Sequence, residues 1–200
     1  AFTLKHGKYT GIVYGGSSRK QKRNFQVGNK ILLNWKSKGE NSSGYFTIEL
    51  IYPISALFFD DKKKSAGIRS AASILKILLP ERQINQIIYD SFEKMLENLK
   101  SETWIQFYVY WELLLIKELG YESDFLIFED SGITKNKQVT INDKLFNIPT
   151  LLQRKNIKEF SNKEIKEALT FNRNLLIENF ILPNKLRYPV FRNILEKYYN

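Results

Sequence analysis

The spacing of apolar residues changes at Pro53, and this change constrains the fold more than any other feature of the sequence. Before Pro53, β-branched and aromatic residues gather in short runs separated by glycine-containing turns, a pattern typical of β-strands. These runs cover residues 9–14, 29–36 and 45–51. After Pro53, apolar residues recur three and four positions apart, which is typical of amphipathic helices. The pattern predicts an α+β protein, with a small β-barrel over residues 1–53 and an all-helical domain over residues 54–200.

Local signals divide the helical part into segments. Apolar stripes predict helices over residues 68–79, 84–99, 104–119, 161–182 and 188–199. Ser161 and Glu164 have the spacing of a capping box, which favours a helix start at that point. The helical pattern is lost over about residues 124–150, where strand-like runs flank Asn142 and Asp143. We expect an irregular insertion with a β-hairpin there.

Positive charge is concentrated in the first segment of the chain. The formal net charge is +10, and residues 1–53 hold nine Lys or Arg against two Glu, a balance of +7. The other 147 residues have a balance of only +3. A concentration of cations in one segment attracts a polyanion, and DNA is the most common one.

The densest basic run lies at residues 19–23, which we expect to form a loop between strands. Four of its five residues are cationic, and such density is unfavourable unless a polyanion relieves the repulsion. The alternative is a solvated loop without a partner. The candidate DNA-binding residues in the first segment are this run and the lysines on neighbouring strands and turns: Lys5, Lys8, Arg19, Lys20, Lys22, Arg23, Lys36 and Lys38.

Aromatic residues are interleaved with these cations. They are Tyr9, Tyr14, Phe25 and Trp35. Base–aromatic stacking contributes about 1 to 3 kcal/mol per base and suits single-strand binding. A small barrel also needs aromatic residues in its core, so each of the four is either a stacking platform or a core residue.

The sequence predicts no catalytic residue, metal site or cofactor. It contains one histidine, His6, and no cysteine, which excludes thiolate and two-histidine metal sites. The acidic pairs Asp60-Asp61 and Glu129-Asp130 lack supporting ligands at a recognisable spacing. The absence of cysteine favours the cytoplasm, and no run approaches the roughly 20 apolar residues of a membrane span.

Several motifs in order along the chain resemble the bacterial RecO family of recombination and repair proteins. Three lie in the first segment: Phe2-Thr3-Leu4-Lys5-His6-Gly7-Lys8, Val13-Tyr14-Gly15-Gly16-Ser17-Ser18-Arg19 and Gln26-Val27-Gly28-Asn29. Two more are Leu79-Pro80-Glu81-Arg82 and the segment from Trp111 to Tyr121, which ends in Leu-Gly-Tyr. The ordered set covers nearly the whole chain.

The resemblance implies an N-terminal OB-fold followed by an α-helical domain, and a chain that begins inside the barrel without the family's first strand. It implies a non-enzymatic recombination mediator of the RecF pathway that binds single- and double-stranded DNA and anneals complementary strands. The implied partners are RecR and the single-stranded-DNA-binding protein, with RecA loaded indirectly. The implied location is the bacterial cytoplasm, in association with the nucleoid.

Residue by residue, the resemblance places Lys8, Arg19, Lys20, Lys22 and Arg23 in the family's basic hairpin and loop. It places Lys185 and Arg187 near a basic pair at the start of the family's last helix. Two departures limit the transfer. Some members have a cysteine zinc site where this chain has none, between Phe125 and Thr150. Other members have arginines where this chain has Val109 and Tyr110, so a site for the single-strand-binding protein's acidic tail must draw its cations from elsewhere.

Two other interpretations remain open from the residues. One is an RNA-binding OB-fold protein, because single-strand barrels tolerate either sugar. The other is a metal-dependent nuclease that uses Asp60-Asp61 or Glu129-Asp130.

Overall fold

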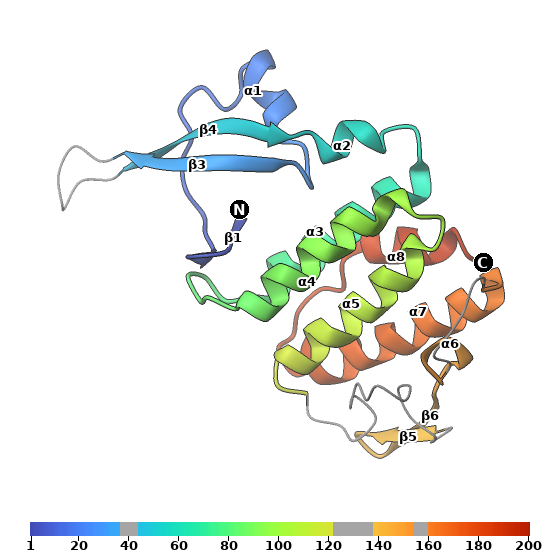
Figure 1. Ribbon diagram of the computed structural model, residues 1–200. Coiled ribbons are helices and arrows are strands. Elements are labelled where there is room, and N and C mark those ends of the chain that lie inside the picture. The colour runs from blue at the N-terminus through green and yellow to red at the C-terminus, as the bar shows by residue number, and fades with distance from the viewer. Residues whose placement is uncertain (37–43, 122–137, 154–159) are drawn as a thin grey trace. The chain divides into compact units, whose positions relative to one another are not determined.

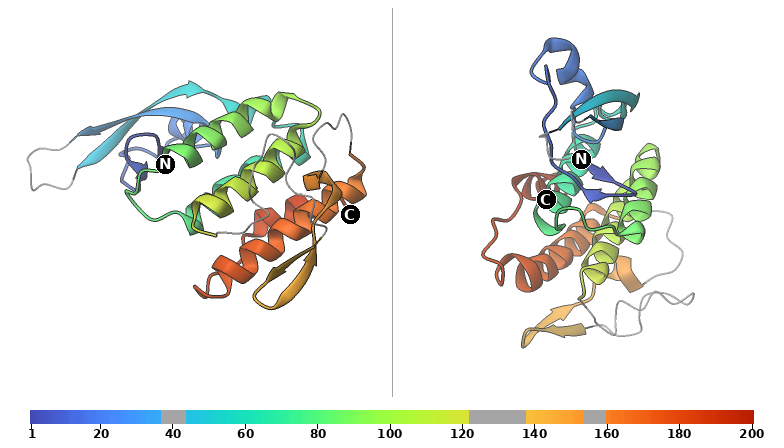
Figure 2. Two further views of the ribbon diagram at one scale, coloured as in Figure 1. Left: turned by 60° about the horizontal axis from the view of Figure 1, so that its bottom comes forward. Right: turned by 90° about the vertical axis from the view of Figure 1, so that its left-hand side faces the viewer.

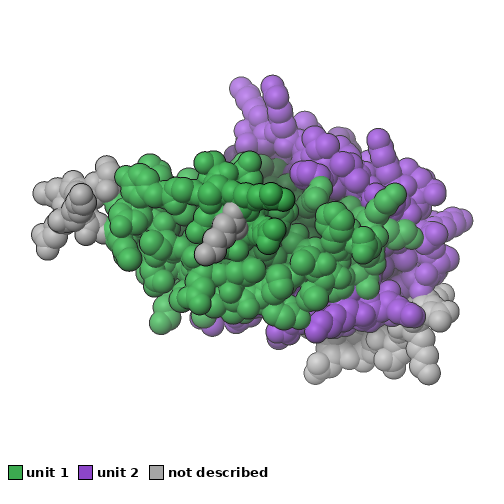
Figure 3. All heavy atoms as spheres, turned by 90° about the horizontal axis from the view of Figure 1, so that it is seen from above, with its two compact units in different colours: residues 1–84 green, residues 85–200 purple. Residues whose placement is uncertain are grey.

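A computed structural model describes residues 1–36, 44–121, 138–153 and 160–200 of the 200-residue chain. The chain divides into two compact units, residues 1–84 and residues 85–200, which Figure 3 shows in different colours. The first unit contains the strands of the basic segment, and the second is mainly helical (Figure 1). The mixed composition agrees with the predicted α+β class.

The first unit begins with a tight antiparallel pair, β1 (Phe2–Thr3) and β2 (Gly7–Lys8). Gly7 has φ +65°, and a Cβ at this position would collide with the backbone carbonyl of Gln83. The motif therefore requires glycine here for both conformation and space.

The predicted strand over residues 9–14 is wrong. This segment contains only an isolated parallel bridge, between Val13 and Phe46. Its β-branched and aromatic composition indicates an extended backbone, but the neighbouring segments that the structure describes do not provide a continuous ladder.

The long hairpin of the first unit is confirmed. β3 (Lys30–Lys36) pairs antiparallel with β4 (Tyr45–Tyr52), with Trp35 opposite Phe46. Paired residues share a face, so this register places three apolar pairs on one side of the hairpin: Ile31 with Leu50, Leu33 with Ile48, and Trp35 with Phe46. The predicted turn over residues 37–44 falls almost entirely outside the described residues.

The strands of the described residues do not form a closed barrel. They form three separate two-stranded sheets, β1-β2, β3-β4 and β5-β6 (Figures 1 and 2). β1 and β2 have two residues each, which is too short to continue a ladder around a barrel. Most of the strands are thus predictable from local composition, whereas closure depends on pairing between distant segments.

Two helices of the predicted helical domain group with the first unit. They are α2 (Ile54–Leu57) and α3 (Lys62–Leu78). The side chain of Asp61 accepts a hydrogen bond from the backbone N–H of Lys64 at 3.0 Å and so caps α3. The compact units divide after Ile84, and the predicted domain boundary at residues 53/54 stays a prediction.

The second unit contains the remaining predicted helices, with boundaries close to those expected. The capping box of Ser161 and Glu164 is formed, and the long helix that follows it continues as a π-helix to Ile181. The helical segments are α4 (Gln86–Glu97), η1 (Asn98–Lys100), α5 (Trp104–Glu118), α6 (Thr150–Gln153), α7 (Asn162–Leu176), η3 (Ile177–Ile181) and α8 (Val190–Lys197).

The predicted hairpin in the insertion is also present. β5 (Gln138–Ile141) and β6 (Lys144–Asn147) pair antiparallel around Asn142 and Asp143. These two residues have φ of 46° and 62°, as a two-residue type I′ turn requires. Of the predicted insertion, residues 124–137 lie outside the described part of the chain.

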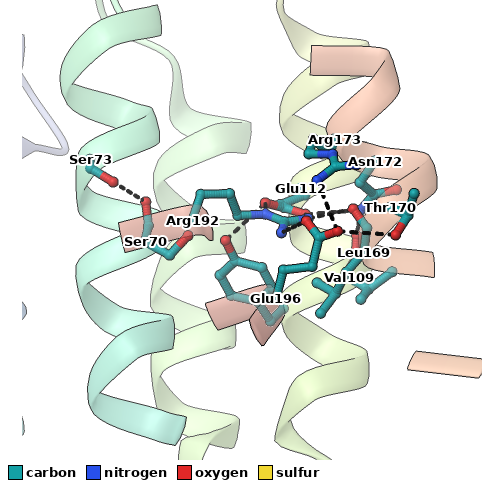
Figure 4. Close-up of polar contacts among 11 residues, drawn as sticks. Ser70, Ser73, Val109, Glu112, Leu169, Thr170, Asn172, Arg173, Arg192 and Glu196 are labelled. Carbon is teal, nitrogen blue, oxygen red and sulfur yellow. Dashed lines mark hydrogen bonds and ion pairs between the residues drawn. The ribbon is translucent and has the colours of Figure 1, made fainter. Parts of the chain in front are cut away.

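A buried ionic network joins α5, α7 and α8, and Figure 4 shows its members. Arg192 and Glu112 both have no exposed side-chain surface, and Nη2 of Arg192 donates to Oε2 of Glu112 at 3.1 Å. The same nitrogen donates to the carbonyl oxygen of Leu169 at 2.7 Å, and Nη1 donates to Glu196 at 3.3 Å. Glu112 also accepts hydrogen bonds from Tyr108 and Asn172, so both charges are well compensated.

We expect an Arg192→Leu substitution to lower the free energy of unfolding by about 3 to 5 kcal/mol, because it leaves Glu112 buried without its counter-charge. The matched control is Arg173→Leu. Arg173 also pairs with Glu196, at 3.2 Å, but its side chain is 36% exposed, so we expect a loss of about 1 kcal/mol or less. Denaturant titration followed by far-ultraviolet circular dichroism measures both. Equal losses in the two variants would contradict a dominant role for the buried pair.

Candidate nucleic-acid interface

The basic run at residues 19–23 is helical, and the predicted loop is wrong. It lies in α1 (Arg19–Asn24), a helix of six residues. The hydroxyl of Ser18 accepts a hydrogen bond from the backbone N–H of Gln21 at 3.3 Å and so caps the first turn. At the other end, the side-chain amide of Asn29 donates to the backbone carbonyls of Arg23 and Asn24.

The helix brings three of the predicted cations together. Arg19, Lys22 and Arg23 occupy positions i, i+3 and i+4, which are neighbours on a helix surface, and all three side chains are exposed. Gln21 lies on the opposite side and lines a pocket with residues of β4. The helix therefore turns its uncharged side to the hairpin and its basic side to solvent.

The charges of this basic side, formed by Arg19, Lys22 and Arg23, are not neutralised within the described structure. None of the three forms an ion pair with a carboxylate among the residues that the structure describes. The sequence gives the local reason, because residues 1–39 contain no Asp or Glu. Lys22 and Arg23 lie in the last turn, where the helix dipole favours cations and partly offsets their mutual repulsion.

The other predicted cations of the first unit are in different environments. Lys5 and Lys36 are exposed, in the β1–β2 turn and at the end of β3. Lys8 is half-buried, its Nζ donating to the carbonyl oxygen of Lys76 at 2.9 Å and lying 3.8 Å from Glu81. Lys8 therefore has partners within its own unit. Lys38 and the side chain of Lys20 lie outside the described part of the chain.

Lys185 and Arg187 belong to the second unit. Both are exposed in the segment between η3 and α8, and Lys185 has a φ of 52°. They lie close to each other in the chain and belong to a different unit from the cations of α1.

The aromatic residues of the basic segment are mostly exposed. Tyr14, Trp35 and Phe25 are 71%, 51% and 40% exposed, whereas Tyr9 is half-buried. Tyr9 packs against Phe46 with ring centroids 5.5 Å apart and lies below the guanidinium of Arg82. Of the four residues, Tyr9 thus has the most structural role, and the other three present ring surface to solvent.

The acidic and histidine side chains that sequence analysis singled out have local structural positions where the structure describes them. Asp61 is the N-cap of α3, and the backbone N–H of His6 donates to Thr3 within the β1–β2 turn. No group of three or more His, Asp or Glu side chains that could hold a metal occurs among the described residues. Glu129 and Asp130 fall outside them. In the same part of the chain, no helix is both long and apolar enough to cross a bilayer.

Sequence reasoning missed the pocket beside α1. It lies between α1, Val13 and Tyr14, and the first residues of β4. Gln21 does not indicate a pocket in the sequence because it stands inside a charged run. Tyr45 does not indicate one because its neighbours predict only a strand. The basic side could have been predicted from the spacing of residues 19, 22 and 23, which share a face if the run is helical.

Comparison with known proteins agrees with the resemblance. A family model described as "Recombination protein O C terminal" matches residues 60–126. A protein named DNA repair protein RecO from Rhodospirillum centenum is 30% identical over 137 residues, which cover 68% of this chain and 55% of the relative. A relative of the same name from Jannaschia sp. is 30% identical with the same coverage.

The matched parts thus span about half the length of these two relatives. A third relative, also named DNA repair protein RecO, comes from a Wolbachia strain of Drosophila simulans and extends the likeness to almost the whole chain. It is 28% identical, and the match covers 97% of this chain and 89% of the relative. With the family model on α3 to α5 and the ordered motifs of the first unit, these matches show that the chain belongs to the RecO family.

Proposed function

We propose that the chain is a non-enzymatic DNA-binding protein of bacterial DNA repair, and that the basic side of α1 makes its contact with DNA. The observation that carries the proposal is the exposed set of Arg19, Lys22 and Arg23, without a carboxylate partner among the described residues. The names of the relatives support the process, because all three are DNA repair proteins.

Phosphate neutralisation is the proposed source of affinity. Guanidinium groups bind phosphate oxygens through two parallel hydrogen bonds, and the ammonium of Lys22 adds a point charge. Such contacts do not read base sequence, so they serve single and double strands alike. Annealing follows, since screening the repulsion between two backbones lets complementary bases meet. Lys5 and Lys36 are proposed as further contacts in the same unit, and Lys185 and Arg187 as contacts in the second unit.

The wider role that we propose is that of a recombination mediator. Membership of the RecO family supports a protein of the RecF pathway that acts with RecR on DNA coated by the single-stranded-DNA-binding protein and promotes RecA loading. The antiparallel β3–β4 hairpin and the Val13–Phe46 bridge support an OB-fold-like arrangement for the first unit. This role belongs to the bacterial cytoplasm, where the nucleoid lies.

Replacing the three cations of α1 tests the contact. We expect Arg19→Ala with Lys22→Ala and Arg23→Ala to weaken binding to all sequences, because the variant neutralises fewer phosphates. The slope of log affinity against log salt falls by about 0.9 for each duplex phosphate that is no longer neutralised, or roughly 2 to 3 units in total. Fluorescence anisotropy over a series of salt concentrations measures this slope.

The matched control removes the same net charge from the second unit. Lys163, Lys166 and Lys197 are exposed on α7 and α8, so their triple alanine variant carries the same total charge as the α1 variant. We expect its slope to stay close to that of the unsubstituted chain. If the slope falls equally in both triple variants, net charge alone governs binding and α1 is not the contact.

A strand-annealing assay tests the wider role. On complementary oligonucleotides precoated with single-stranded-DNA-binding protein, we expect the chain to accelerate annealing and the α1 triple variant to lose most of that acceleration. An RNA-binding module or a nuclease is not expected to accelerate the annealing of these coated oligonucleotides. No acceleration, stronger binding to a matched RNA, or cleavage of labelled DNA in magnesium would each count against the proposal.

A further inference from the structure

A pocket of about 110 Å³ lies against the uncharged side of α1, the side that faces β4. A cavity needs a volume on the order of 10 to 15 Å³ to hold one water molecule, so this pocket is several times larger than one ordered water requires. Residues from α1, from the extended segment before it and from β4 line it: Val13, Tyr14, Gln21, Tyr45, Phe46, Thr47 and Ile48. It therefore combines aromatic and aliphatic walls with a few polar groups, a composition typical of small-molecule sites.

The most exposed wall is Tyr14. Its side chain is 71% exposed, and its ring meets that of half-buried Tyr45 edge to face, with centroids 4.8 Å apart. This contact supports Tyr14 from one side and leaves ring surface open to solvent. A tyrosine side chain has few rotatable bonds, so it loses little conformational entropy when it is ordered. A supported, exposed ring can therefore stack on a base at a low entropic cost.

Two polar residues that line the pocket have free hydrogen-bonding capacity. The side-chain oxygen of Gln21 accepts a hydrogen bond from Asn24 at 3.1 Å, which orients its amide and leaves the NH₂ group without a partner among the described residues. The hydroxyl of Thr47 likewise has no partner within that part of the chain. Both groups match the donors and acceptors on the edge of a nucleobase.

We propose that this pocket takes one unpaired nucleobase, stacked on Tyr14, while Arg19, Lys22 and Arg23 hold neighbouring phosphates. The inference rests on the proposed DNA contact and adds a preference for single strands, because the bases of a duplex are already paired and stacked. Gln21 and the three cations belong to the same six-residue helix, so the base contact comes from its pocket side and the phosphate contacts from its basic side.

The test compares the unsubstituted full chain with its Tyr14→Ala variant, and measures the affinity of each protein for a strand with bases and for one without. We expect Tyr14→Ala to weaken binding to a thymidine oligonucleotide at least about fivefold, the lower end of base–aromatic stacking. Removing the bases instead, with an abasic strand of equal length, weakens the unsubstituted chain by a similar factor. The abasic strand has no further effect on the variant, because both changes remove the same interaction. Duplex affinity is unchanged by Tyr14→Ala.

The control variant is Tyr52→Ala, which removes a tyrosine of 41% exposure from the other end of β4 and leaves the affinities for the thymidine strand, the abasic strand and the duplex unchanged. Additive losses from Tyr14→Ala and the abasic strand, or equal losses on single strands and duplex, overturn the base site. Tyr14→Phe keeps the ring and retains single-strand affinity, and its failure to do so likewise overturns the stacking role. The proposed phosphate contact fails separately, through an unchanged salt slope in the α1 triple variant.

Discussion

The packing of the helical unit depends on the buried pair of Arg192 and Glu112. A charge without water is tolerated only when its partners fully replace the solvent, and here one guanidinium meets two carboxylates and a backbone carbonyl. Three helices must therefore meet at one point with fixed spacing, which ties α5, α7 and α8 to a single arrangement. Burial also raises the pKa of the neighbouring Tyr188 phenol far above its usual range, so it remains neutral beside this network.

Arg192 and the cations of α1 lie in opposite environments. Arg192 is fully buried and compensated, whereas Arg19, Lys22 and Arg23 are exposed in a segment without acidic residues. The first arrangement stabilises a fold, and the second is suited to an external polyanion. The short α1 helix makes the second arrangement possible, because it gathers separate cations on one side while its other side lines the pocket with β4.

Local signals predict most of the elements and little of what depends on distant contacts. The Asn142-Asp143 turn, the Ser161 cap and the β3–β4 hairpin follow from residue types at fixed spacing. α1 escapes prediction because six residues with no apolar stripe carry no periodic signal, and a serine cap alone does not indicate a helix. The sequence suggests an open cation at Lys8, yet its partners Lys76 and Glu81 lie about 70 residues further along the chain. Arg192 and Glu112 are 80 residues apart, and no local sequence pattern predicts that they pair.

Backbone NMR can locate the DNA contact residue by residue and so decide whether α1 provides it. Titration of the isotope-labelled chain with a short single strand should shift the amide resonances of residues 19–24 first, with those of Tyr14 and Tyr45–Thr47. The amides around Lys8 and Glu81, whose side chains are paired with each other, should move little. Shifts confined to other segments, with the amides of α1 unchanged, would show that the DNA contact lies elsewhere.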